Sequence, residues 1–362
     1  MYSQRSVKVN LGVQGYSIKV GYNLLTKLGE IIVNEIPDVT GCIVVTSPTI
    51  DELYGSKIHE GLNPMSPARL LVPDGEEAKS WENAEELLGE FIKLNLDRKC
   101  LVIAVGGGAV GDLAGFASSI YLRGVRVVNV PTTLLSMVDS SIGGKTAINH
   151  AKGKNLIGSF HQPSLVVDDT KFLETLPLIE ISSGLAEALK HGVIADKGLF
   201  SFIKDNSSKL LGKKDNALVE LITLNASIKA TYVMKDERDT LGVRAALNYG
   251  HTLGHAIERL LSPEIRHGEA VAIGMNYAAL IAEKLGYMSS EDVKTQRTVL
   301  EKLNLPTKLP DVKIKDVIQL MSRDKKAESG AIKLVVPTGI GSEPVLMYVN
   351  EKLLNETMKE IR

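Results

Sequence analysis

Histidines are concentrated in one short part of this sequence. Three of its seven histidines, His251, His255 and His267, fall within seventeen residues. His251 and His255 are four residues apart, a spacing that puts both on one face of a helix. Upstream, Glu187 and Lys190 are three residues apart in a second helical segment and share a face as well. One carboxylate and two imidazoles with an open position form a catalytic zinc pattern, so these residues predict a metal site.

The spacing alone does not decide which histidines would bind the metal. The pair at i and i+4 could supply two ligands by itself, although the H-E-x-x-H motif of metalloproteases is absent. The alternative is a group of core or surface histidines with satisfied hydrogen bonds, which is the usual interpretation of a lone histidine. We favour the metal site, because three of the seven histidines lie so close together in the sequence.

A glycine-rich turn predicts a dinucleotide site. The segment GGGAVGD at residues 106–112 matches G-x-G-x-x-G between an apolar strand and a helix. Glycines there let backbone N–H groups approach a pyrophosphate at the helix N-terminus. The acidic residue expected about twenty positions later, which would hold a ribose, is missing. A tight turn that serves only packing is the alternative.

Two further turns also follow predicted strands. Thr132 and Thr133 end the next strand, and their hydroxyls should reach the same crevice, because ligands lie at the carboxyl ends of strands in open α/β sheets. Glu76 and Lys79 follow an earlier strand in PDGEEAK, where a carboxylate could accept hydrogen bonds from a ribose or an adenine. An exposed helix start with favourable acidic charge is the alternative there.

A group of cations lies between these turns and the histidines. Lys145 follows two glycines, Lys154 and Asn155 come nine and ten residues later, and Arg123 precedes them. The SSIGGKT segment resembles the end of a Walker A motif but lacks its first glycine, so we reject a P-loop. The three cations suit a phosphate dianion, with a solvated loop as the alternative.

The elements that carry these residues change in character along the chain. Apolar β-branched segments alternate with helical ones as far as residue 175, and long amphipathic helical patterns follow. We therefore predict an α/β, Rossmann-like N-terminal domain with a mostly parallel sheet at 1–175 and a mainly α-helical C-terminal domain at 176–362. The first would bind the dinucleotide, and the second would bind metal and substrate.

Composition narrows the class of protein. A formal net charge of −1 gives no sign of a nucleic-acid or acidic-membrane partner. The two cysteines, Cys42 and Cys100, lie in apolar segments and read as buried free thiols of a reducing cytosol. The N-terminus has no apolar secretory region, and the stretch 101–120 is too polar for a membrane span. We expect a cytoplasmic protein without nucleic-acid or membrane partners.

Together these segments resemble one family, the dehydroquinate synthases, within the wider family of sugar-phosphate cyclases. The resemblance runs in order from residue 73 to 275, and DKK at 324–326 extends it. The combination is far more specific than any single motif. Its motifs are PDGEEAKS, GGGAVGDLAGFASS, RGVRVVNVPTTLLSMVDSSIGGKTAIN, GKNLIGSFHQP, GLAEALKHG, DERDTLGVRAALNYGHTLGHAIE and RHGEAVAIGM.

The resemblance implies roles for individual residues. It assigns zinc, or cobalt in its place, to Glu187, His251 and His267, and it makes His255 a substrate and proton-relay residue. It places NAD on Glu76, Lys79, Gly107, Gly108, Asp112, Thr132, Thr133, Asp139, Lys154, Phe172, Thr175 and Glu180. It places substrate groups on Arg123, Lys145, Asn155, Lys190, Lys229, Arg244, Asn248 and one lysine of DKK, which we take as Lys326.

The same resemblance implies a reaction. The family's substrate is 3-deoxy-D-arabino-heptulosonate 7-phosphate, a small sugar phosphate. Transient oxidation of an alcohol by NAD acidifies a neighbouring C–H bond, phosphate leaves, the ketone is reduced again, and an intramolecular aldol closes the ring. The enzyme would be a phosphate-eliminating carbon–oxygen lyase of the shikimate pathway. It would be a homodimer in which Arg123 contacts the substrate phosphate across the interface.

The sequence departs from the family pattern in two places. An aspartate and an asparagine that usually touch the adenosine ribose after the second strand are replaced in the stretch of Ser47 and Thr49, which leaves NADP open. The loop DERDTLGVR is one residue longer than the common form, and the resemblance carries its acidic residue over to Asp239.

Three other functions remain as alternatives. A related cyclase could act on another sugar phosphate, although Lys229, Arg244 and Asn248 favour a substrate with a carboxylate. A polyol or glycerol-phosphate dehydrogenase would produce net NADH, which a cyclase does not. A non-catalytic regulator that binds metal or dinucleotide would not need the full set of ligands and lysines.

Overall fold

The computed structural model describes residues 4–63, 65–324 and 331–362 and divides into two compact units. Unit 1 comprises Met1–Thr175 and Leu218–Arg238, and unit 2 comprises Leu176–Ala217 and Asp239–Arg362. The predicted division kept 218–238 with the C-terminal domain. In the structure most of helix α7 (Asp215–Lys235) belongs to unit 1 instead, where it pairs Glu220 with Arg5 and Lys229 with Asp139. A helical pattern shows where a helix forms but not which unit it packs against.

Unit 1 contains a sheet in the order β1-β2-β9-β6-β5-β3-β4. All neighbouring strands are parallel except β1 and β2, which form an antiparallel hairpin. Strand β5 is buried along its whole length, as expected for an apolar strand covered on both faces. The strands are β1 (Arg5–Val9), β2 (Tyr16–Gly21), β3 (Cys42–Thr46), β4 (Ala68–Leu71), β5 (Leu101–Gly106), β6 (Arg126–Pro131) and β9 (Leu165–Asp169).

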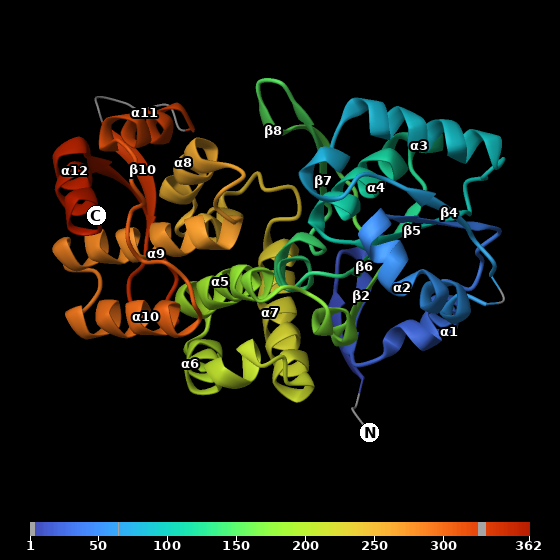
Figure 1. The fold of residues 1–362 in the computed structure, drawn as a ribbon, viewed down its shortest axis with the longest axis horizontal. Coiled ribbons are helices and arrows are strands. Elements are labelled where there is room, and N and C mark those ends of the chain that lie inside the picture. The colour runs from blue at the N-terminus through green and yellow to red at the C-terminus, as the bar shows by residue number, and fades with distance from the viewer. Residues whose placement is uncertain (1–3, 64, 325–330) are drawn as a thin grey trace. The chain divides into compact units, whose positions relative to one another are not determined.

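Helices cover both faces of this sheet (Figure 1). Helices α1 (Leu28–Glu35) and α2 (Pro48–Gly61) lie on one face, and α3 (Trp81–Lys93) and α4 (Gly108–Ile120) lie on the other. Leu87 and Phe91 of α3 and Leu113 of α4 form one core with Val102 of β5 and Val127 of β6. Ser80 caps α3 by accepting a hydrogen bond from Asn83 N.

A two-stranded hairpin leaves the sheet between β6 and β9. It consists of β7 (Lys145–His150) and β8 (Gly153–Phe160), and its tip extends away from the sheet in Figure 1. No pattern in the sequence indicates these strands, since β8 is mostly exposed on both sides and lacks an alternating apolar pattern.

Unit 2 is mainly helical and is organised around α9, which is buried almost throughout. Helices α5, α8 and α10 pack along it, and α12 and β10 complete its surroundings. Ile273 and Tyr277 of α9 form a core with Val317, Ile332 and Leu354. The elements are α5 (Leu178–Ala195), α6 (Lys197–Leu211), α8 (His251–Leu261), α9 (His267–Lys284), α10 (Ser290–Lys302), α11 (Ile314–Asp324), β10 (Ala331–Val336), β11 (Val345–Asn350) and α12 (Glu351–Glu360).

The predicted fold class, a mostly parallel α/β part and a mainly helical part, is confirmed. One helix among the described residues, α7, is long and apolar enough to cross a membrane. Its most apolar window is 61% buried, and core helices of soluble proteins pass the same test.

Candidate metal centre and dinucleotide turn

Three helices of unit 2 bring the predicted metal ligands together. Glu187 lies in α5, while His251 and His267 are the first residues of α8 and α9. Gly268 makes the approach of α9 to α5 possible, because a Cβ atom there would lie 2.2 Å from the carbonyl oxygen of Ser183. Gly268 N also donates to Ser183 Oγ at 3.0 Å. Since Ser183 and Glu187 are one helical turn apart, this contact sets His267 beside Glu187.

The donor atoms have the arrangement of a three-ligand metal site. Oε1 of Glu187 lies 3.5 Å from His251 Nε2 and 3.3 Å from His267 Nε2. The three donor atoms are all within 4.8 Å of one another. Two imidazoles and a carboxylate are ligands that zinc and cobalt accept, so the residues fit such an ion. His255 is outside this group, with its ring centroid 5.2 Å from that of His251.

Both histidine rings are fixed through the other nitrogen. Nδ1 of His251 is 3.0 Å from the carbonyl oxygen of Tyr249, and Nδ1 of His267 is 3.0 Å from Oε2 of Glu258. A hydrogen bond at Nδ1 leaves Nε2 of each ring for a metal. Glu258 was absent from the predicted site. The sequence feature that could have identified Glu258 is its position seven residues after His251, which places both side chains on the same face of α8.

The two histidines have opposite pKa shifts. Burial lowers the pKa of His251 to about 3, although Glu187 acts in the other direction. Burial also lowers the pKa of His267, but hydrogen bonds to Glu187 and Glu258 outweigh it and raise the value to about 10. At neutral pH, His251 is therefore ready to bind a metal, whereas His267 first has to lose a proton.

The other predicted site residues of unit 2 differ in how far they are buried. Lys190 is buried and forms an ion pair with Glu187, and Arg244 is buried in a short 3₁₀ helix. Asn248 and His255 are exposed. Glu180, assigned to NAD by the resemblance, lies in α5 and pairs with Arg266 Nε at 3.1 Å. Lys326 lies outside the described residues.

The predicted glycine turn of unit 1 joins β5 to α4. Gly107 is the N-cap of α4 and Gly108 its first residue, so the first N–H groups of the helix face the end of the strand. A Cβ on Gly108 would lie 2.9 Å from Ser140 Oγ. The turn therefore needs glycine to leave a cradle at the helix N-terminus, which fits a pyrophosphate.

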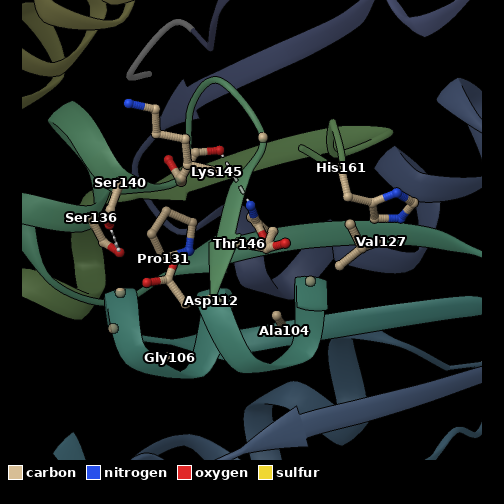
Figure 2. A pocket seen from close by; sticks show the side chains of 17 residues that line it. Ala104, Gly106, Asp112, Val127, Pro131, Ser136, Ser140, Lys145, Thr146 and His161 are labelled. Carbon is tan, nitrogen blue, oxygen red and sulfur yellow. Dashed lines mark hydrogen bonds between the residues drawn. The ribbon is translucent and has the colours of Figure 1, made fainter. Parts of the chain in front are cut away.

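A pocket adjoins this turn (Figure 2). Asp112, Ser136, Ser140 and Lys145 gather on one side of it, and His161 lies at the other end. Thr132 N donates to Gly106 O at 3.0 Å, which holds the end of β6 against the glycine turn. The adjacent Thr133 accepts a hydrogen bond at Oγ1 from Ser136 N at 3.2 Å.

Lys79 links the third turn to this pocket. Its buried Nζ donates to Asp112 Oδ2 at 2.7 Å and to Oδ1 of Asn155 on the hairpin. Burial raises the pKa of Asp112, and the Lys79 ammonium opposes that rise. Glu76 accepts from Asn149 Nδ2 at 2.8 Å. The structure therefore brings Glu76, Lys79, Asp112 and Asn155 into one network.

Several other predicted residues of unit 1 follow α4 in the sequence. Asp139 forms an ion pair with Lys229 of α7. Lys145 and Lys154 are exposed on the hairpin, and Arg123 is exposed after α4 with a left-handed backbone (φ 67°).

Phe172 and Thr175 follow β9. Both contact Tyr54 of α2, through ring centroids 4.7 Å apart and a 2.8 Å hydroxyl pair respectively. Phe172 is buried and Thr175 is exposed.

Comparisons with known proteins cover nearly the whole chain. The family model described as 3-dehydroquinate synthase N-terminal matches residues 69–183, and that described as 3-dehydroquinate synthase C-terminal matches residues 184–327. A relative from Thermodesulfovibrio yellowstonii named 3-dehydroquinate synthase is 41% identical over 360 residues, covering 98% of each chain.

Two solved structures share the fold. One is 2-deoxy-scyllo-inosose synthase complexed with carbaglucose-6-phosphate, NAD+ and Co2+, with a TM-score of 0.90, 26% identity, and coverage of 99% of this chain and 100% of that one. The other is 2-epi-5-epi-valiolone synthase from Streptomyces hygroscopicus with NAD+ and Zn2+ bound, with a TM-score of 0.85, 26% identity and coverage of 96% of both chains.

Proposed function

This chain belongs to the 3-dehydroquinate synthase family, and we propose on that basis that it converts 3-deoxy-D-arabino-heptulosonate 7-phosphate into 3-dehydroquinate and phosphate. The observation that carries the proposal is the cluster of Glu187, His251 and His267 with Lys190 paired to its carboxylate. The reaction is that of a carbon–oxygen lyase. It is part of aromatic amino acid biosynthesis in the cytoplasm.

We assign one cofactor to each unit. Unit 1 would bind NAD at the α4 N-terminus, and unit 2 would hold zinc or cobalt on its three ligands. When bound, NAD would accept and return a hydride at a substrate alcohol while the metal acidifies that hydroxyl. The solved structures of similar fold, which carry NAD+ with Co2+ or Zn2+, support this assignment.

The chain's own residues would bind and orient the substrate. Lys145, Lys154 and Asn155 of the hairpin, with Arg123, supply cations and an amide for the phosphate. Arg244 is buried and can grip a carboxylate with two parallel hydrogen bonds, with Lys190, Lys229 and Asn248 serving the remaining oxygens. His255 is exposed beside His251, which suits a group that relays a proton.

Turnover with the proposed substrate tests this function. The protein is incubated with the heptulosonate phosphate, zinc and a catalytic amount of NAD, and phosphate and carbocycle are measured. We expect both products in equal amounts, no accumulation of NADH, and loss of activity with a chelator. Accumulating NADH would identify a dehydrogenase instead. Faster turnover of a sugar phosphate without a carboxylate would identify another cyclase of the same fold.

We also propose a homodimer. The support is the exposed position of Arg123, which the family resemblance places across a subunit interface. Light scattering measures the molar mass of the protein in solution and so shows whether it is a dimer. Mixing Arg123→Ala with Lys190→Met should restore activity in mixed dimers, because each variant retains the residue that the other lacks. Two inactive variants that stay inactive together would contradict the role of Arg123 across the interface.

A further inference from the structure

A buried hydrogen-bond network in unit 2 ends at one of the metal ligands. Tyr249 and Gln296 of α10 are both fully buried. Oη of Tyr249 lies 3.0 Å from Oε1 of Gln296 and 3.0 Å from the carbonyl oxygen of Met275 in α9, the two acceptors for its single proton. Nε2 of Gln296 donates to the same Met275 oxygen at 3.2 Å. A backbone carbonyl can only accept, so the amide nitrogen faces Met275 and the amide oxygen faces the tyrosine.

The same tyrosine supports a metal ligand with its backbone. Its carbonyl oxygen accepts a hydrogen bond from Nδ1 of His251 at 3.0 Å. This bond sets the tautomer and the orientation of the imidazole and leaves Nε2 for the metal. Tyr249 is therefore joined to the ligand through its carbonyl group and to α9 and α10 through its hydroxyl group.

The turn between Tyr249 and His251 has little freedom to move. Gly250 is the N-cap of α8 and has a left-handed backbone (φ 79°). A Cβ atom on Gly274 of α9 would lie 1.9 Å from the carbonyl oxygen of Gly250, so the two backbones touch directly. Backbone packing thus holds Gly250, and the hydroxyl network holds Tyr249. The peptide unit between these two residues carries the carbonyl that His251 uses.

We propose that Tyr249 is a positioning residue for the metal ligand His251 and that Gln296 acts through it. The inference rests on the proposed metal site and extends it to two residues outside the three ligands. Without its hydroxyl, the tyrosine ring has no fixed acceptors, so its carbonyl can shift and the imidazole can rotate. A ligand that is already held in its binding orientation loses less conformational entropy when the metal binds, and the affinity is higher for that reason.

Zinc affinity and the visible spectrum of bound Co2+ test the inference on the full chain. Tyr249→Phe removes the hydroxyl and keeps the ring. We expect it to lower zinc affinity about three- to tenfold, less than the loss of about 10- to 100-fold that is typical of a direct partner of a ligand. The Co2+ absorption bands should shift, because they report the geometry of the ligands.

Tyr277→Phe is the matched control. Tyr277 is also a buried tyrosine of unit 2, and its hydroxyl donates to the carbonyl oxygen of Leu354 at 2.9 Å instead of supporting a metal ligand. This variant should lower thermal stability and leave zinc affinity and the Co2+ spectrum unchanged.

A double variant separates positioning from stability. In Tyr249→Phe the buried amide oxygen of Gln296 loses its donor, which by itself destabilises the fold. Adding Gln296→Met replaces that amide with an apolar side chain of similar shape, so thermal stability should recover while zinc affinity and the Co2+ spectrum stay altered. Recovery of both metal measurements together with stability would show a purely structural role and overturn the inference. Wild-type affinity and spectrum in Tyr249→Phe would overturn it as well.

The same measurements keep this inference distinct from the proposed reaction. A wild type that binds zinc but does not turn over the heptulosonate phosphate would contradict the proposed reaction, and the comparison of affinities would still decide the role of Tyr249. A wild type that binds no zinc would overturn the metal site and this inference together. If Tyr249→Phe does not fold, the double variant provides the measurement, and wild-type zinc affinity there would overturn the inference.

Discussion

The two histidines of the candidate metal centre, His251 and His267, have different hydrogen-bond partners at Nδ1. Nδ1 of His251 is held by a backbone carbonyl and Nδ1 of His267 by the carboxylate of Glu258. A carboxylate makes the imidazole a stronger donor at its other nitrogen than a carbonyl does, and it adds negative charge near the cation. Glu258 should therefore set much of the metal affinity without touching the metal.

We predict that Glu258→Gln lowers zinc affinity by about 10- to 100-fold. The amide oxygen can still accept from Nδ1, so the ring orientation is kept and only the charge is lost. Competition with a chromophoric chelator measures the affinity. Glu269→Gln is the matched control, since Glu269 lies two residues after His267 but bonds the backbone N of Arg266 at 2.8 Å. Equal losses in both variants would point to a disturbed helix start instead.

Metal binding should also release a proton. The pKa of His267 is raised to about 10 without metal, so this ring is charged at neutral pH and must become neutral to bind. His251, with a pKa lowered to about 3, is already neutral at neutral pH and has no proton to release when the metal binds. We expect about one proton to be released for each metal ion that binds. The metal affinity should fall about tenfold for each unit by which the pH is lowered between about 9 and 6. Calorimetry in buffers of different ionisation enthalpy measures the release, and a value near zero would contradict this protonation state.

At the scale of elements, the metal centre depends on how closely α9 approaches α5. We predict that Gly268→Ala weakens metal binding and destabilises unit 2 by about 1–3 kcal/mol, because the new Cβ would overlap the Ser183 backbone. Gly89→Ala is the control, since nothing lies within 4 Å of a Cβ on that helical glycine of α3. That change should instead stabilise the protein by up to about 1 kcal/mol. Thermal unfolding and zinc titration of both variants test the pair.

The sequence predicts elements whose side chains are buried and apolar. It does not predict elements that form only through contacts with residues far away in the chain. Strand β5 and the hairpin of β1 and β2 carry clear patterns because burial selects their side chains. Strand β8 is exposed and carries no such pattern. The metal ligands could be chosen because histidines are rare in this chain and the resemblance fixes their order. The bond of Glu258 to His267 depends on the crossing of α8 and α9, which no local pattern records.

At the scale of the molecule, each cofactor is assigned to a different unit, and hydrogen exchange can separate them. Zinc alone should slow backbone exchange where α5, α8 and α9 carry the ligands, because a bound ion stabilises the state that holds it. NAD alone should slow exchange at 106–112 and 131–140, the turns around the α4 N-terminus. At 100 times the dissociation constant, each ligand contributes about 2.7 kcal/mol to the unit that binds it. Protection by zinc that begins in the glycine turn, or by NAD that begins at α9, would contradict the assignment of one cofactor to each unit.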